Sequence, residues 1–353
     1  MLFSLKHEEK KYCTKEDITP VIVQLTRSID TIQELDFTSN VFKPEAVVEL
    51  CKCIRKMKNL KNIILEGIFA TLSKSEMETC FKDICSSLKD KKLILLDLSN
   101  NALSSDLPEE FTDLLSNLNT LKFLKIRNCG LGYKGGNIIG ECLDKLTDKN
   151  NFEYLDIAQN RFFNFPEKLC EGISNFKRLS VLRLEYNTIE KISMTQALKV
   201  IKDLPLEVLD IRDNFLDVEG CKLLGEIFAT CNIRELVMGD CMTYSEGMLE
   251  FIKYANNKFV SMGLPGDCTD FVECVLDVSY NDWEQECIED LIHFCKKYFI
   301  KKLFITGNLY DDSSELMKAM HKYGGELIYN ELEAEQDLKS EFDDALIEKL
   351  EFL

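Results

Sequence analysis

The stretch Leu93–Leu103, LILLDLSNNAL, follows the frame L-x-x-L-x-L-x-x-N-x-L. The same frame returns as LSVLRLEYNTI at residues 179–189 and as LEVLDIRDNFL at residues 206–216. Its second Leu position recurs ten times, at intervals of 27 to 40 residues, as Leu35, Ile63, Leu96, Leu124, Leu155, Leu182, Leu209, Leu236, Leu276 and Leu303. A repeat of this length indicates a solenoid, in which each unit buries its apolar face against its neighbours.

Each part of the frame has a structural role. The L-x-L residues alternate along a short strand, so the two Leu side chains enter the core while the x side chains face the other way. An Asn follows where the chain leaves the strand, and its amide can bond backbone groups that the turn leaves unpaired. This position holds Asn40, Asn101, Asn160, Asn187, Asn214, Asn281 and Asn308, with Cys129 and Cys241 as substitutes.

The segments between the strands have helical patterns. Pro44 can open one helix, in which Val47, Leu50, Cys51 and Ile54 form an apolar stripe. A second helix is expected around an apolar face made of Leu224, Ile227 and Phe228. The sequence therefore predicts an α/β leucine-rich-repeat horseshoe of about ten repeats, with a concave parallel β-sheet and helices on the convex side.

The repeats predict one leucine-rich-repeat domain over residues 1–325, with an N-terminal cap over about 1–25. The 40-residue interval indicates an insertion near residues 256–270. Residues 326–353 form a predicted acidic tail, whose ten acidic and two basic residues carry −8 of the net charge of −18. Such a tail disfavours nucleic-acid binding and suits either a basic partner or solubility.

Composition limits the remaining classes. No apolar run is long enough to span a membrane, and the charged N-terminus lacks a secretory apolar core. The 15 cysteines occupy apolar repeat positions, as expected of small buried residues in a reducing compartment. Cys51 and Cys53 lack a second pair at zinc spacing, so no metal is predicted. No membrane contact is expected, and the expected location is the cytoplasm, the perinuclear region included.

No motif points to an active site in this chain. Its three histidines lie near no nucleophile motif, and the glycines from Gly130 to Gly136 are explained by a turn and a helix start. The x positions of the strands carry mixed charges, which favour either a solvated face or a surface that recognises a protein. These positions are Asp36, Asp97, Lys125, Arg127, Asp156, Arg183, Glu185, Asp210, Arg212 and Asp277.

One repeat carries a more specific signal. Residues 121–136 read LKFLKIRNCGLGYKGG, which resembles the L-x-L-x-N-[NC]-G-[LM]-G-x-x-[GA]-G segment of the Ran GTPase-activating proteins. Residues 31–42, TIQELDFTSNVF, and residues 96–103, LDLSNNAL, are similar to earlier repeats of that family. Their order, together with the acidic end, extends the resemblance over nearly the whole chain.

The resemblance implies that the chain is not itself an enzyme but activates a Ran-like small GTPase in its GTP state, which would bring GTP and Mg²⁺ with it, so no cofactor is expected here. A Ran-binding protein could take part in the complex. Asn128 is implied to order the catalytic glutamine of the partner, in support of nucleocytoplasmic transport. The expected partner contacts lie along one rim of the repeats and comprise Lys74, Asp97, Asn100, Lys125, Arg127 and Asp156.

One departure from the family pattern concerns the segment S-D-[MI]-F-T-G-R-x-[KR], which reads EGIFATLSK at residues 66–74. Ile68, Phe69 and Lys74 match, whereas Leu72 replaces the Arg. Either Lys74 or a neighbour supplies the charge, or the chain binds a Ran-like GTPase and activates it weakly. The alternative is a non-catalytic leucine-rich-repeat scaffold that binds a basic partner through Asp36, Asp97, Asp156, Asp210 and Asp277.

Overall fold

The computed structural model describes residues 1–330 except residues 7, 257–273 and 299. These residues belong to two compact units, Met1–Leu209 and Asp210–Leu353. Nearly all of the predicted insertion near residues 256–270, and the predicted acidic tail from residue 331 onward, lie outside the described residues.

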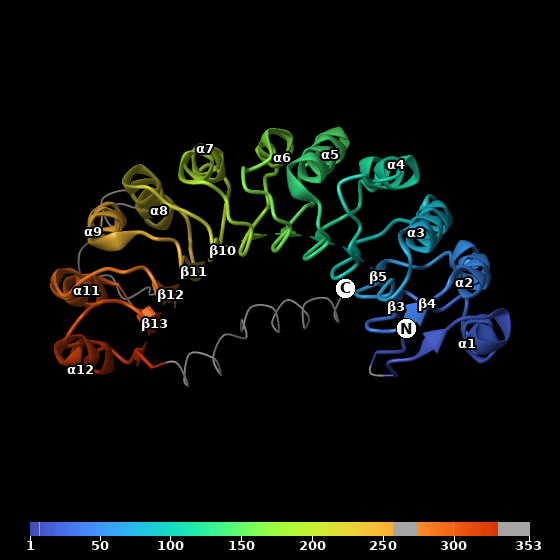
Figure 1. Cartoon of the computed structure of the whole chain (residues 1–353), viewed down its shortest axis with the longest axis horizontal. Coiled ribbons are helices and arrows are strands. Elements are labelled where there is room, and N and C mark those ends of the chain that lie inside the picture. The colour runs from blue at the N-terminus through green and yellow to red at the C-terminus, as the bar shows by residue number, and fades with distance from the viewer. Residues whose placement is uncertain (7, 257–273, 299, 331–353) are drawn as a thin grey trace. The chain divides into compact units, whose positions relative to one another are not determined.

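Unit 1 alternates short strands and helices. Its strands are β1 Leu2–Ser4, β2 Lys11–Tyr12, β3 Glu34–Asp36, β4 Val41–Phe42, β5 Asn62–Ile64, β6 Leu95–Asp97, β7 Phe123–Lys125, β8 Tyr154–Asp156 and β9 Val181–Arg183. Its helices are α1 Lys15–Arg27, α2 Pro44–Lys56, α3 Lys74–Leu88, α4 Glu109–Asn117, α5 Gly132–Lys145, α6 Glu167–Ile173 and α7 Lys191–Ile201. Figure 1 shows the strands of the main sheet as one layer of this unit and the helices as the other.

Unit 2 continues the alternation, and strand β10, Val208–Asp210, lies at its boundary with unit 1. The other elements of unit 2 are α8 Val218–Thr230, β11 Glu235–Val237, α9 Tyr244–Ala255, β12 Cys274–Asp277, α11 Glu286–Lys297, β13 Ile300–Phe304, α12 Ser314–Lys322 and β14 Glu326–Ile328. Strands β11 to β14 pair in parallel and in chain order.

The repeat frame determines the register of the main sheet. In unit 1 the parallel pairing places Leu35 beside Ile63, Ile63 beside Leu96, and Leu96 beside Leu124. The second-Leu side chains of these strands are at most 1% exposed, so they form one continuous column of the core. The predicted α/β leucine-rich-repeat fold is confirmed by this order of strands and helices.

Two further strands extend the sheet beyond the ten predicted repeats. Strand β1 pairs with β3, with Phe3 beside Leu35. Strand β14 pairs with β13, with Leu327 beside Leu303. The repeat array thus continues three residues past the domain boundary predicted at residue 325, and it begins inside the predicted N-terminal cap.

The helices form for the local reasons that the sequence indicates. Helix α2 has Pro44 in its first turn and buries Val47, Leu50, Cys51 and Ile54, as predicted. Helix α8 buries its predicted apolar face. Helix α3 begins with a capping box, in which Ser73 accepts the N–H of Glu76 and the Glu76 carboxylate accepts the N–H of Ser73.

Helices α5 and α6 approach each other closely through glycine. A Cβ atom on Gly140 would lie 2.2 Å from the backbone of Lys168, and one on Gly172 would lie 2.5 Å from the carbonyl oxygen of Gly140. Any larger residue at either position would push the two helices apart. Gly140 therefore serves helix packing.

The Asn of each frame ties consecutive repeats together. Asn160 is fully buried, and its Nδ2 donates to the carbonyl of Ile126 in the preceding repeat (2.7 Å) and to that of Ile157 in its own (3.0 Å). Its Oδ1 accepts the N–H groups of Cys129 (3.0 Å) and Leu131 (3.3 Å). The predicted role of the Asn in pairing backbone groups of the turn is confirmed.

The Cys substitutes make part of the same connection. Cys129 Sγ lies 3.2 Å from the carbonyl oxygen of Leu98, and Cys241 Sγ lies 3.4 Å from that of Ile211. A thiol can donate one weak bond, whereas an amide can donate two and accept as well. These repeats depend on the Asn of the following repeat, because Asn160 and Asn281 accept the backbone N–H groups of Cys129 and Cys241.

We expect Asn160→Ala to lower the free energy of unfolding by roughly 3 kcal/mol, because several buried backbone groups would lose their side-chain partner. The measurement is urea unfolding followed by circular dichroism. Asn128→Gly is the matched control, since it removes an exposed amide and should change stability by less than about 1 kcal/mol. Equal stability of the two variants would show that the buried amide does not hold the repeats together.

Candidate functional site

A row of residues with left-handed backbone conformation runs along the turns that follow the strands. In unit 1 this turn row comprises Ser39, Gly67, Asn100, Asn128, Gln159 and Tyr186, with φ between 56° and 68° except for 52° at Asn128. Each member directly precedes the frame position that holds Asn in most repeats, and Ile68 or Cys129 in two of them. The N–H of Asn100 donates to the carbonyl of Arg127, and that of Asn128 to the carbonyl of Ala158, so the row follows the repeats.

Asn128 is exposed in this row, and its main chain is held by the neighbouring repeat. Asn tolerates positive φ better than most residues other than glycine. Its Nδ2 donates to Asn100 Oδ1 at 2.8 Å. Within the described residues Asn128 Oδ1 accepts no hydrogen bond, so a rigid turn presents a carbonyl oxygen to solvent.

Asn100 links Asn128 to a residue that was not predicted. Its Nδ2 donates to Glu66 Oε1 at 2.8 Å, which places three side chains from consecutive repeats in one hydrogen-bonded line. Glu66 is half-buried and lies one position before Gly67 of the turn row. Alignment of the repeat frames could have placed Glu66 near Asn100, because residues 39, 67, 100 and 128 share one frame position.

The x-position aspartates are buried rather than solvated. Asp36, Asp97, Asp156, Asp210 and Asp277 are 1–8% exposed. Their Oδ1 atoms accept the N–H two residues ahead: 3.0 Å from Thr38, 2.9 Å from Ser99, 3.1 Å from Ala158, 3.1 Å from Arg212 and 2.9 Å from Ser279. The expectation of a solvated face is wrong for these five, because an Asp can close an Asx turn at the strand end.

Arg127 is held inside unit 1 by two carboxylates. Its Nε donates to Asp156 Oδ2 at 2.9 Å, and its Nη2 donates to Glu185. The two carboxylate side chains are 5–6% exposed, whereas that of Arg127 is 28% exposed. The guanidinium therefore compensates buried negative charge, and Asp156 positions Arg127 while it closes its own turn.

Asp97 has only partial compensation. Burial raises its pKa to about 6, against the opposing effects of Lys125 and of hydrogen bonds from Ser99. The Nζ of Lys125 lies 5.2 Å from the ring centroid of Tyr154 and its side chain is half-exposed. The ammonium of Lys125 thus lies near the Tyr154 ring on a side chain that reaches the surface, whereas Asp97 is buried.

Lys74 and Leu72 lie where the chain enters α3. Lys74 is the exposed first residue of the helix, and its Nζ is 3.8 Å from a carboxylate oxygen of Glu78. One residue before the half-buried Leu72, Thr71 Oγ1 accepts a hydrogen bond from Lys11 Nζ at 3.2 Å. Lys11 belongs to β2, and no local pattern could have placed this cation at the turn.

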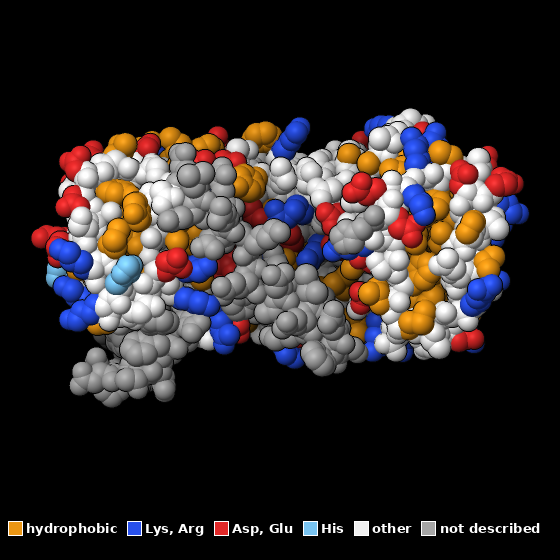
Figure 2. All heavy atoms as spheres, turned by 90° about the horizontal axis from the view of Figure 1, so that it is seen from below, with side chains coloured by type: hydrophobic (Ala, Val, Ile, Leu, Met, Phe, Trp, Pro, Cys, Tyr) orange, Lys and Arg blue, Asp and Glu red, His pale blue; other side chains and the backbone are white. Residues whose placement is uncertain are grey.

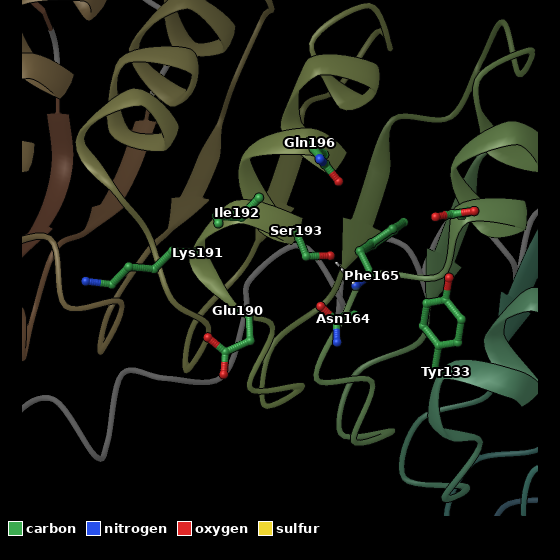
Figure 3. Close-up of a pocket in the computed structure, with 9 residues that line it drawn as sticks. Tyr133, Asn164, Phe165, Glu190, Lys191, Ile192, Ser193 and Gln196 are labelled. Atoms are coloured by element: carbon green, nitrogen blue, oxygen red, sulfur yellow. Dashed lines mark hydrogen bonds between the residues drawn. The ribbon is translucent and has the colours of Figure 1, made fainter.

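A pocket of about 840 Å³ lies at the start of the helices α5 to α7. Its lining includes Tyr133, Phe165 and Ile192, with Glu190 and Lys191 at the start of α7 (Figure 3). Ser193 Oγ accepts the N–H of Phe165 at 2.8 Å, which ties the loop before α6 to α7. None of the predicted site residues lines this pocket.

On the face drawn in Figure 2, the charges of the described residues do not separate into fields of one sign. Figure 2 shows basic and acidic side chains interspersed with apolar ones over the described residues of one face. Among the described residues, no group of three His, Cys, Asp or Glu side chains is arranged to hold a metal ion. In the same part of the chain, every helix is too short or too polar to cross a membrane.

Comparison with known proteins gives a family, relatives and a solved structure to which this chain is similar. The model of the Leucine Rich Repeat family matches residues 92–114. Ran GTPase-activating protein 1 of Saccharomyces cerevisiae is 26% identical over 343 residues, which cover 90% of this chain and 80% of the yeast protein. An internalin from Listeria monocytogenes is 11% identical, with a TM-score of 0.41 over 90% of this chain and 77% of that structure.

Two animal proteins show the same similarity over shorter regions. Ran GTPase-activating protein 1 of Xenopus laevis is 26% identical over 197 residues, covering 55% of this chain and 33% of the frog protein. The Ran GTPase-activating protein of Drosophila melanogaster is 24% identical over 229 residues, covering 64% of this chain and 35% of the fly protein. The chain thus spans about a third of these two relatives.

The strand order and the buried Asn positions define the chain as a leucine-rich-repeat protein. Within that class it is similar, over nearly its whole length, to the Ran GTPase-activating proteins. The resemblance predicted from the motifs is therefore confirmed.

Two isosteric variants separate the roles of the buried aspartates. Burial raises the pKa of Asp97 from the ordinary 3.8 to about 6. The protonated carboxyl of Asp97 therefore contributes to the stability of the folded state most fully below pH 3.8, and this contribution is lost as the pH rises through about 6. We expect Asp97→Asn to raise the free energy of unfolding at pH 7 by about 2 kcal/mol. The dependence of stability on pH between 4 and 7 should also become shallower.

Asp156→Asn should have the opposite effect. It would turn an amide N–H toward Arg127 and remove one of the two compensating charges, at a cost of about 1–3 kcal/mol at pH 7. Urea unfolding of both variants across this pH range tests the pair. A loss of stability in Asp97→Asn, or a gain in Asp156→Asn, would contradict the assignment.

Proposed function

We propose that this chain stimulates GTP hydrolysis by a Ran-like small GTPase in its GTP state, without an active site of its own. The observation that carries the proposal is the similarity to yeast Ran GTPase-activating protein 1 over 90% of the chain. The exposed amide of Asn128, on a turn held by the next repeat, supports it.

Phosphoryl transfer to water needs a positioned nucleophile and stabilised charge more than it needs new covalent chemistry. In the proposed complex Asn128 Oδ1 accepts a hydrogen bond from the side-chain NH₂ of the catalytic glutamine of the partner. The carbonyl oxygen of that glutamine then remains free to accept a hydrogen of the attacking water. GTP and Mg²⁺ are carried by the partner.

The surroundings of Asn128 support different roles for the predicted contact residues. Lys74 and Lys125 offer exposed or half-exposed cations for docking. Arg127 is bound to Asp156 and Glu185, so we assign it the task of holding the turn that carries Asn128. Lys11, hydrogen-bonded to Thr71, is a candidate to supply positive charge next to Leu72.

The scaffold alternative finds less support. It relied on Asp36, Asp97, Asp156, Asp210 and Asp277 to attract a basic partner, and these carboxylates are buried. A buried, hydrogen-bonded carboxylate is a poor anchor for a mobile cation, because the partner would have to break the turn to reach it. We also propose that the chain acts on its Ran-like partner in the cytoplasm, in support of nucleocytoplasmic transport. The complex can include a Ran-binding protein.

We expect Asn128→Gly to lower the kcat of stimulated hydrolysis by about a hundredfold while the chain stays folded. Glycine is preferred to alanine here, because φ is 52° and a Cβ would add strain. The measurement is GTP hydrolysis by Ran with catalytic amounts of each variant. Asp240→Gly is the control, since it changes the same frame position four repeats further on.

Retention of full activity by Asn128→Gly would remove Asn128 from the mechanism. A similar loss in Asp240→Gly would indicate a general effect on the repeats rather than a local one.

A further inference from the structure

In the line of side chains from Asn128 through Asn100 to Glu66, both hydrogen bonds are donated in the same direction. Glu66 Oε1 accepts from Asn100 Nδ2 at 2.8 Å, and Asn100 Oδ1 accepts from Asn128 Nδ2 at 2.8 Å. The three residues come from consecutive repeats, and the backbones of Asn100 and Asn128 are fixed in the same left-handed conformation. We call this line the amide relay.

The carboxylate end of the amide relay sets its direction. A carboxylate can only accept hydrogen bonds, so Asn100 must turn its NH₂ toward Glu66 and its carbonyl oxygen toward Asn128. Asn128 must then turn its own NH₂ toward Asn100. With a neutral or donating residue at position 66, both amides could rotate together and exchange the places of nitrogen and oxygen.

We infer that Glu66, acting through Asn100, is a positioning residue that fixes the orientation of the Asn128 amide, so that its Oδ1 faces the partner. The inference rests on the proposed function for its consequence, because a glutamine held through its NH₂ keeps its carbonyl oxygen for the attacking water. A reversed Asn128 would hold the glutamine through its carbonyl oxygen instead, and the water would lose its acceptor.

Other groups near the amide relay do not supply this orientation. Arg127, which precedes Asn128, donates to Asp156 and Glu185. On the other side of Asn128, the next member of the turn row is Gln159. Its side-chain amide can direct either its carbonyl oxygen or its NH₂ group toward a neighbour, so it imposes no orientation. Among the described residues hydrogen-bonded in the amide relay, Glu66 is therefore the group whose chemistry allows only one direction.

Three variants test the direction separately from the charge. Glu66→Lys places a donor at the head of the amide relay, which should turn both amides around. The double variant E66K/N100D keeps the Lys but puts a carboxylate with two acceptor oxygens in the middle of the relay, so Asn128 is again forced to donate its NH₂. Glu66→Gln has the same net charge as the double variant and leaves the direction unspecified.

We expect Glu66→Lys to lower the kcat of stimulated hydrolysis about tenfold, with a smaller change in KM, because orientation matters after docking. The double variant should return to within about threefold of the wild type, and Glu66→Gln should fall between them. Urea unfolding should show similar stability for all three, since the amide relay is at the surface.

A second readout does not depend on GTP hydrolysis. The side-chain NH₂ resonances of Asn128, assigned by NMR through Asn128→Gly, should shift in Glu66→Lys and return toward their original positions in the double variant. If the wild-type chain fails to stimulate Ran, the proposed function fails while these shifts still test the amide relay.

Two results would overturn the inference. One is wild-type kcat in Glu66→Lys on a chain that does stimulate Ran. The other is a double variant as impaired as Glu66→Lys, together with unchanged NH₂ resonances of Asn128.

Discussion

The buried amide that recurs at most strand ends is the constraint on which the rest of the structure depends. Short strands leave their turns with unpaired backbone groups that neither water nor a long ladder can satisfy. Asn160 shows the solution, because one side chain bonds groups of its own repeat and of the preceding one. The turns are thereby held in one conformation from repeat to repeat, and the residue before each Asn is driven into positive φ.

This constraint explains how an ordinary turn residue could become a functional one. A position fixed by its neighbours presents its side chain to a partner with little loss of conformational entropy. Asn128 occupies such a position, and its amide is oriented through Asn100 by Glu66. The buried aspartates accept backbone N–H groups in the turns, and Arg127 compensates Asp156 and Glu185, so the charges of the strands serve the geometry of the exposed row.

The repeat frame was sufficient to predict the fold, because its period requires stacked strand–helix units and its Asn position has one structural use. It could not predict the edge strands β1 and β14, in which the half-buried Phe3 and the buried Leu327 pair with Leu35 and Leu303 without the full frame. Alternation correctly placed Asp97 on the face opposite Leu96 and Leu98, but alternation alone does not reveal that an Asx turn will bury the carboxylate. The role proposed for Asn128 came from resemblance and not from the frame.

The most direct test of the central claim is single-turnover hydrolysis of GTP by Ran, with and without substoichiometric amounts of this chain. Our account predicts an acceleration of at least about a thousandfold, with each molecule acting on many copies of Ran. An unchanged rate, under conditions in which the chain is folded and Ran is loaded with GTP, would contradict it.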